Sequence, residues 1–261
     1  MANIIDSQCV LVVGSAAEIG RTLALLTVIV CSRCKERLDE LVALHIATGR
    51  LKSVTLDVLS ERNVLKSSIE DIVNTYPDHY PMQIGTDRLS RFLFSNGIQR
   101  AFDFTKPEAV YLESLKCELA TNYTSIVRMI AFFLPHLIEL GKQGHLTFLY
   151  TVYSGLSIVL AAGIIDYCAT KSTIHDLSIS LAAQPNKKNN HVVEIILSQH
   201  DFEGTTQRLS NFWLSLEEYT KVMMEGLVRG DTYVPAQMVV EQHKKFEEGK
   251  LEAATKATTQ T

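Results

Sequence analysis

The sequence predicts an α/β fold in which a doubly wound parallel sheet, flanked by helices, forms a single domain. Short runs of β-branched and apolar residues alternate with longer stretches of helical periodicity, as in a series of βαβ units. The chain has 261 residues, of which 46% are hydrophobic and 21% are charged. These proportions are ordinary for one globular domain with a large buried core.

Six short apolar runs are expected to form the strands of the sheet. Because almost every residue in them is apolar, each strand is expected to be buried on both faces, as strands of a parallel sheet usually are. The runs cover residues 9–13, 27–31, 53–56, 92–95, 146–151 and 192–197.

Five longer stretches have the spacing of amphipathic helices. We expect one domain over residues 1–237. Residues 238–261 are rich in Lys, Glu, Ala and Thr, and they are expected to form a polar C-terminal helix or tail that frays over residues 256–261. The helical stretches cover residues 35–47, 60–75, 112–141, 164–184 and 216–228.

The charge of the chain gives no reason to expect nucleic acid or an anionic membrane as a partner. Lys and Arg number 25 against 29 Asp and Glu, so the formal net charge at pH 7 is −4. The first residues lack the basic region of a signal peptide, and the apolar stretch 22–32 is shorter than the ~20 residues that span a bilayer. We therefore expect a cytoplasmic protein that contacts no membrane.

The cysteines indicate a reducing compartment. Five of them are scattered through apolar stretches, an odd number that does not suit a disulfide scaffold. Cys31 and Cys34 form a C-x-x-C pair. Because no second pair of Cys or His residues lies at ligand spacing, the sequence predicts no metal site.

A glycine-containing turn follows the first expected strand. Gly14 and Gly20 enclose a run of mostly small residues, which would let backbone N–H groups approach a pyrophosphate at the N-terminus of a helix. The turn therefore predicts a phosphate site in a Rossmann-like fold, although a strand-to-helix turn also needs glycine for steric reasons. Only 14 residues separate Val13 from Val28, so the first helix is expected to be short.

Two basic residues, Arg33 and Lys35, follow the second expected strand. A protein that binds the ribose 2′-hydroxyl of NAD would place Asp or Glu here, whereas a cation can neutralise the 2′-phosphate of NADP(H). The sequence thus favours NADP(H) over NAD(H); the alternative is that both side chains are solvated residues that open a helix. The missing acidic residue also argues against a methyltransferase.

Tyr167 and Lys171 are the strongest candidates for proton transfer. At positions i and i+4 of an expected helix, the phenol and the ammonium share one face, so the cation can favour the ionised phenol. Lowering a phenol pKa from about 10 to about 7 requires roughly 4 kcal/mol, which a nearby cation and a cofactor charge can supply in a dry cleft. A Y-x-x-x-K pair alone is common by chance, so its context decides its meaning.

In that context, most of the chain resembles the short-chain dehydrogenase/reductase family. Gly14 and Gly20 match the outer glycines of the family's T-G-x-x-x-G-I-G turn, and Glu18 replaces the middle glycine. Asp57 with Val58 resembles the family's adenine-contacting Asp-Val pair, while capping of a turn by Asp57 is the alternative.

The resemblance extends beyond the fourth expected strand. Gly97 matches the family's N-N-A-G motif, Asn96 is displaced by one place, and Phe94 with Ser95 replaces the two asparagines. After the sixth strand the family's Pro-Gly is absent, and Thr205 matches its nicotinamide-binding threonine by approximate position alone. The residues expected to bind the cofactor are Gly14, Ser15, Ile19, Gly20, Arg33, Asp57, Val58, Asn96, Gly97, Tyr167, Lys171 and Thr205.

The resemblance implies catalytic roles for four residues. Tyr167 would donate a proton to the substrate oxygen, and Ser154, just after the fifth expected strand, would polarise the same oxygen. Lys171 with Asn122 would supply a proton relay. A turn serine and a polar helix position are the alternatives for Ser154 and Asn122.

The function implied by the resemblance is that of an NADP(H)-dependent oxidoreductase, which interconverts a carbonyl and a secondary alcohol by hydride transfer. The alternative is a diverged, catalytically impaired relative with a binding or assembly role. Glu18, the short first crossover, Phe94 with Ser95 and the missing Pro-Gly favour this alternative, because all of them alter the cofactor motifs.

The expected partner is a small-molecule carbonyl or alcohol. A candidate lid over residues 204–230 contains Trp213 and other large apolar side chains, which predicts an apolar or aromatic substrate unless they pack on the sheet. The resemblance also implies a homodimer or homotetramer that associates through the helices at 112–141 and 164–184.

Overall fold

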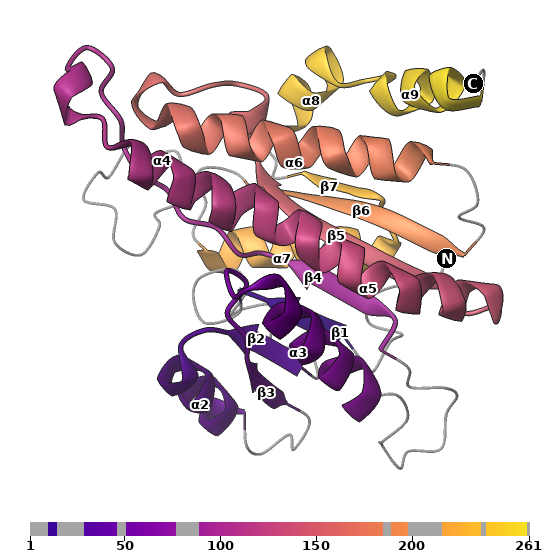
Figure 1. Cartoon of the computed structure of the whole chain (residues 1–261). Coiled ribbons are helices and arrows are strands. Elements are labelled where there is room, and N and C mark those ends of the chain that lie inside the picture. The colour runs from indigo at the N-terminus through magenta and orange to yellow at the C-terminus, as the bar shows by residue number, and fades with distance from the viewer. Residues whose placement is uncertain are drawn as a thin grey trace.

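Seven parallel strands form one sheet in a computed structural model of the chain (Figure 1). The structure describes residues 10–14, 29–45, 51–76, 89–184, 189–197, 216–235 and 239–259. Within them the strand order is β3-β2-β1-β4-β5-β6-β7, and each neighbouring pair is parallel. The strands are Val10–Val13 (β1), Ile29–Ser32 (β2), Lys52–Thr55 (β3), Arg91–Phe94 (β4), Thr147–Ser154 (β5), Asn190–Leu197 (β6) and Tyr233–Pro235 (β7).

This topology confirms the predicted single-domain, Rossmann-like sheet. The chain order reverses at β1, which pairs with β2 on one side and with β4 on the other. In open α/β sheets, ligands bind beyond the carboxyl ends of the strands at such a switch point. β7 was not predicted, because three residues that include a proline carry too little periodicity to be recognised as a strand.

The third strand corrects one prediction. Burial on both faces was expected, but Lys52, Ser53 and Thr55 are exposed and Val54 is half-buried. β3 is the edge strand of the sheet, so it has a neighbour on one side only. Polar and charged side chains at an edge hinder pairing with another chain.

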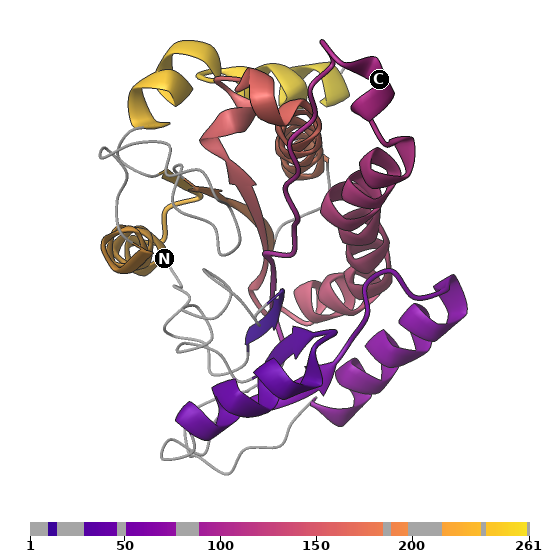
Figure 2. The same cartoon turned by 90° about the vertical axis from the view of Figure 1, so that its left-hand side faces the viewer.

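Helices cover both faces of the sheet. α3, the continuous α4–α5 helix and α6 lie on one face, and α2 and α7 lie on the other (Figure 2). The helices are Lys35–Leu44 (α2), Arg62–Thr75 (α3), Leu112–Leu119 (α4), Ser125–Lys142 (α5), Ile165–Ala183 (α6), Leu216–Arg229 (α7), Val240–Phe246 (α8) and Lys250–Thr259 (α9), with short 3-10 helices at Pro107–Ala109 (η4), Gly155–Ser157 (η6) and Ala162–Ile164 (η7).

The predicted helix 112–141 contains an unpredicted π-helical turn, Ala120–Thr124 (η5), between α4 and α5. The combined helix Leu112–Lys142 is long and apolar enough to cross a membrane, a test that core helices of soluble proteins also pass. Its apolar face is packed inside the protein, where the centre of the Phe133 ring lies 4.1 Å from the centre of the Phe92 ring of β4.

The C-terminal residues 239–259 form α8 and α9, which lie over α6 (Figure 1). Fraying was expected from residue 256 onward, but helix α9 continues to Thr259. A polar C-terminal helix was expected, but its docking along α6 could not be foreseen from composition.

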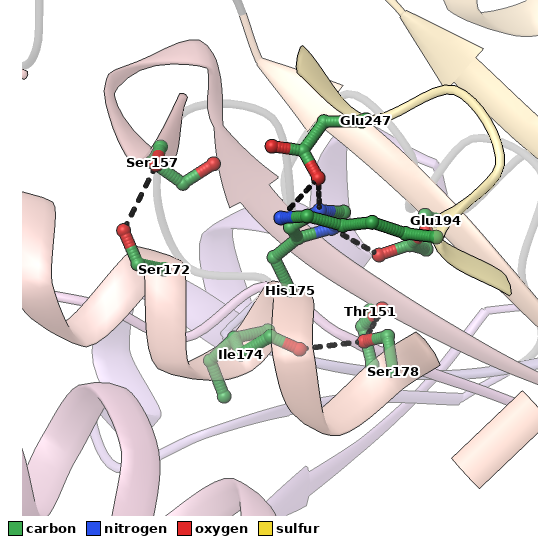
Figure 3. Close-up of polar contacts among 9 residues, drawn as sticks. Thr151, Ser157, Ser172, Ile174, His175, Ser178, Glu194 and Glu247 are labelled. Carbon is green, nitrogen blue, oxygen red and sulfur yellow. Dashed lines mark hydrogen bonds and ion pairs between the residues drawn. The ribbon is translucent and has the colours of Figure 1, made fainter. Parts of the chain in front are cut away.

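A buried ionic cluster attaches this segment to the sheet, and we call it the C-terminal clasp. His175 of α6 lies between Glu194 of β6 and Glu247 of the α8–α9 turn (Figure 3). Its Nδ1 is 2.8 Å from the Glu194 carboxylate and its Nε2 is 2.9 Å from that of Glu247, which also pairs with Lys250. Burial lowers the pKa of His175, but the bonds and charges of both glutamates outweigh burial and raise it. The imidazolium thus bridges two carboxylates.

Replacement of His175 by Ala is expected to lower the free energy of unfolding by roughly 3 kcal/mol, because the buried carboxylate of Glu247 and the half-buried carboxylate of Glu194 lose their shared partner. Since the folded-state pKa of His175 is raised, its contribution is fully present below the unfolded value of about 6.5 and is lost as pH rises through the folded value. Denaturant unfolding of the wild type and of His175→Ala between pH 6 and 9 measures this contribution. His145→Ala, outside the clasp, is the control. If the stability lost in His175→Ala does not change with pH, the charged His175 bridge is contradicted.

Candidate active site

The carboxyl ends of β1 and β4 approach each other closely at the switch point. Ser95 donates to the Val13 carbonyl from both its backbone N–H, at 3.0 Å, and its Oγ, at 2.9 Å. Gly14 follows with φ of +87°, and a Cβ there would lie 2.6 Å from the backbone nitrogen of Asn96. Gly14 is therefore required by backbone conformation and by packing against β4, independently of any phosphate.

Several predicted features fall outside the described residues. These are Ser15, Glu18, Ile19 and Gly20 of the glycine turn, the expected short first helix, Thr205, and the part of the candidate lid that contains Trp213.

Asn122 lies fully buried in the π-helical turn. Its Oδ1 accepts a hydrogen bond from the Ile98 N–H at 2.8 Å, and its Nδ2 donates to the Ile98 carbonyl at 2.8 Å and to Thr170 Oγ1 at 3.1 Å. The side chain thus pairs with the backbone after β4 as a neighbouring strand would, and it also reaches α6. π-Helical turns inside α-helices are frequent at functional sites.

Asn96 faces the same turn. Its Nδ2 donates to the Thr121 carbonyl at 2.8 Å and to Ser125 Oγ at 2.9 Å. Its Oδ1 is buried and has no hydrogen-bond partner among the residues that the structure describes. The side chain therefore fastens the end of β4 to the π-helical turn, a role that the sequence alone did not indicate.

Lys171 converges with Asn122 at Gly97. A Cβ at Gly97 would lie 3.3 Å from Lys171 Nζ and 3.5 Å from Asn122 Oδ1, so a side chain there would press on both groups. Lys171 Nζ donates to the Val152 carbonyl at 3.2 Å and lies 5.6 Å from the centre of the Tyr167 ring. The structure therefore brings four predicted site residues together.

The Lys171 ammonium is almost completely buried, at 3% exposure. Burial lowers its pKa to about 8, and the charge of Glu118 opposes this shift. A buried lysine with a pKa near neutrality can both stabilise a nearby anion and exchange a proton.

Ser154 is the last residue of β5, so this strand continues three residues beyond the predicted end at Thr151. Its Oγ accepts from the Leu156 N–H at 3.2 Å and thereby caps the short helix η6. The Leu156 side chain packs with the buried Tyr167 at the start of α6. The structure thus shows the turn-capping role that was the alternative for Ser154. Leu156 also connects the end of β5, where Ser154 lies, with the start of α6, where Tyr167 lies.

The polar residues near β2 and β3 that were predicted to bind the nucleotide lie at the surface. Arg33 is exposed just after β2, whereas Lys35 forms a surface ion pair with Asp39 at 2.5 Å. Asp57 Oδ1 accepts from the Leu59 N–H at 2.9 Å, which is the turn-capping arrangement. Val58 packs against the core.

The C-x-x-C pair does not have the features of a redox site. Cys31 is buried in β2, and burial raises the pKa of its thiol. Cys34 is half-buried, and its Sγ lies 3.4 Å from a carboxylate oxygen of Glu36. A reactive thiol requires a lowered pKa, whereas burial raises the pKa of Cys31.

Glu118, which was not predicted as a site residue, lies one turn before Asn122 on α4 and is fully buried. Burial and the charge of Asp166 raise its pKa to about 7, whereas Arg100 and Lys171 act in the opposite direction. The spacing of four residues from Asn122 was the available signal, because it places Glu118 close to the same face of the helix.

Comparisons with known proteins agree with this geometry. Residues 8–201 match the family described as short chain dehydrogenase. The uncharacterized oxidoreductase DltE of Bacillus subtilis (strain 168) is 29% identical over 240 residues, which cover 86% of each chain.

Two solved structures share the fold. A short chain dehydrogenase from Burkholderia cenocepacia J2315 in complex with NADP has a TM-score of 0.71 at 17% identity, covering 97% of this chain and 99% of its own. One from Mycobacterium smegmatis has a TM-score of 0.70 at 17% identity, covering 90% and 94% respectively.

Substitution of Gly14 by Ala is expected to cost about 3 kcal/mol of stability, because a positive φ is strained and the new Cβ would collide with the backbone at Asn96. Gly144→Ala is the matched control. Gly144 has φ of +89° with open space around its Cβ position, so about 1 kcal/mol is expected there. Denaturant unfolding measures both losses, and equal losses would contradict the close approach of β1 and β4.

Proposed function

The chain belongs to the short-chain dehydrogenase family, and from this premise we propose that it transfers a hydride between NADP(H) and a carbonyl or secondary alcohol substrate. The observation that carries the proposal is the convergence of Asn122, Lys171 and Tyr167 beside Gly97 at the switch point of the sheet. Fold similarity alone would not support an activity, whereas this set of groups can move a proton.

The described residues fit a nicotinamide cofactor. Gly97 has no side chain to fill the space beside the Lys171 ammonium, and a cation at this position suits a ribose hydroxyl. Arg33 is exposed beyond β2, where a 2′-phosphate would require a positive charge. When bound, the cofactor supplies or accepts the hydride.

The side chains of this protein would carry the proton. Tyr167 would donate its phenolic proton to the carbonyl oxygen as the alcohol forms, and Ser154 Oγ would hydrogen-bond the same oxygen. Lys171, with a pKa of about 8, is mostly charged at pH 7 and would stabilise the phenolate beside it. Asn122 would hold the backbone after β4 so that this arrangement is kept.

A second candidate function is a catalytically impaired relative with a binding or assembly role. The observation in its favour is that Phe94 and Ser95, which replace two asparagines of the family motif, contribute to packing and strand contacts in this structure. Phe94 is buried in the core and Ser95 fastens β4 to β1. A protein of this kind would bind NADPH weakly and would lose no activity when Tyr167 is replaced.

Association into a homodimer or homotetramer belongs to the same proposal. The helices α4, α5 and α6 carry large apolar side chains that remain exposed in the single chain, including Leu119, Ile138 and Ile165. Burial of such side chains against a second copy would be favourable. The sequence-based expectation of a cytoplasmic location also stands as a proposal.

Tyr167→Phe is expected to lower the rate of NADPH-dependent ketone reduction at least ~100-fold, because the proton donor is lost while the ring remains. The affinity for NADPH should stay within about twofold, since the Tyr167 ring and the other residues expected to bind the cofactor are unchanged. Steady-state rates with a panel of aryl ketones and a fluorescence titration with NADPH measure the two effects. Tyr111→Phe, an exposed position, is the control; an unchanged rate in Tyr167→Phe would support the second candidate function.

Arg33→Ala is expected to weaken NADPH binding about tenfold and to leave NADH binding unchanged, because only NADPH carries the 2′-phosphate. Thermal-shift titrations with each cofactor measure this. Arg37→Ala, on the exposed surface of α2, serves as the matched control. Equal weakening of both cofactors would remove Arg33 from cofactor selection, and the absence of any NADPH-dependent shift in the wild type would refute the proposed function.

A further inference from the structure

The C-terminal segment 239–259 contacts the end of the strand that carries Ser154, and the mechanism above leaves this contact unused. Val239, which begins the segment, is buried and belongs to the hydrophobic core. A Cβ at Gly155 would lie 2.8 Å from Val239 Cγ2 and 3.6 Å from the Leu197 carbonyl oxygen. The Val239 side chain therefore occupies the space of a side chain at Gly155, the residue directly after Ser154.

The rest of the turn after β5 is fastened to α6. Ser172 Oγ of α6 donates to the Ser157 carbonyl at 3.0 Å (Figure 3). Ser154 Oγ accepts from the Leu156 N–H at 3.2 Å, so the place of this hydroxyl follows that of the turn. Gly155 lies within this turn and has no side chain of its own to pack. Its position therefore depends on the side chain from the C-terminal segment that lies against it.

A second contact joins the same segment to the same strand end through the clasp. The centre of the Tyr153 ring lies 4.7 Å from that of the His175 ring. The Tyr153 hydroxyl is buried and has no hydrogen-bond partner among the residues that the structure describes, so the position of this side chain depends on the packing of its ring. His175 Nε2 is in turn 2.9 Å from the carboxylate of Glu247. The clasp thus links the C-terminal segment to the residue directly before Ser154.

We propose that the C-terminal segment positions Ser154 for catalysis, with Val239 acting on the residue after it and the clasp acting on the residue before it. This inference rests on the proposed reductase function, in which Ser154 Oγ hydrogen-bonds the substrate oxygen. A group that polarises a carbonyl must be held within about 0.5 Å of its productive place, because small displacements remove much of the rate. Val239 and Glu247 are positioning residues that act through Ser154.

Paired substitutions test the contact between Val239 and Gly155. Gly155→Ala should lower kcat for ketone reduction about tenfold, because the new Cβ collides with Val239 and displaces the turn that holds Ser154. Val239→Ala should lower kcat about fivefold through loss of the contact, with the KM for NADPH unchanged. The double variant should recover to within about threefold of the wild type, because the shortened side chain makes room for the Cβ. Losses that multiply in the double variant would overturn the proposed contact.

Val240→Ala is the matched control, because Val240 is the next residue along the segment and its side chain is exposed. Its kcat should equal that of the wild type. If Val239→Ala also keeps the wild-type kcat while Tyr167→Phe is inactive, the positioning inference is overturned and the reductase function stands.

A second measurement does not depend on activity. The Leu156 amide donates to Ser154 Oγ, so its hydrogen exchange with solvent, followed by NMR, reports on the position of this hydroxyl. Val239→Ala should lower the protection factor of this amide at least about tenfold, whereas Val240→Ala should leave it unchanged. An unchanged value in Val239→Ala would overturn the inference even if the wild type reduces no ketone. An equal fall at Leu11 of the distant strand β1 would also overturn it, because the loss would then be one of general stability.

Glu247→Gln tests the part played by the clasp. It removes the charge that the C-terminal segment contributes and keeps the size of the side chain. The protection factor of the Leu156 amide should fall about threefold, because a neutral amide binds the imidazolium less strongly than a carboxylate does. Glu248→Gln, at the exposed neighbouring position, is the control and should leave this value unchanged. Wild-type protection in Glu247→Gln would overturn the role of the clasp in positioning Ser154.

Discussion

The pairing of the Asn122 amide with the backbone of Ile98 is the contact on which the candidate site depends. It replaces the hydrogen bonds that a further strand residue would make, so the chain after β4 stays close to the π-helical turn. Its third hydrogen bond, to Thr170, reaches α6 within one turn of Lys171. A buried side-chain amide that makes these three hydrogen bonds is costly to displace. It therefore holds the segment after β4, the π-helical turn and α6 together.

α6 connects this site to the rest of the molecule. Tyr167, Lys171 and His175 follow one another at intervals of four residues, so they lie along one side of the helix. The first two face the site, and the third is the centre of the C-terminal clasp (Figure 3). The segment 239–259 thereby closes over the helix that carries Tyr167 and Lys171. The packing of Tyr153 against His175, with ring centres 4.7 Å apart, extends this contact to the strand that ends at Ser154.

Prediction from the sequence succeeded where burial produces a periodic pattern. The strands at the centre of the sheet and the five predicted helices could be recognised, because a buried parallel strand is apolar throughout and a covering helix is apolar on one side. For the edge strand β3 the sequence located the strand but not its exposure, which follows from its position at the edge of the sheet, and β7 was missed because it is too short. The π-helical turn and the binding of Asn96 to it depend on residues far away in the chain.

The sequence by itself determined the alternation that builds a doubly wound sheet and the spacing that places Tyr167 and Lys171 on one helical face. Both properties are local, because they depend on periodicity within one element. Only the tertiary structure decided that Lys171 is buried beside Gly97, that Glu118 shares its environment and that the clasp closes over α6. Desolvation and charge coupling arise between elements that are distant in the chain, so no single stretch of sequence contains them.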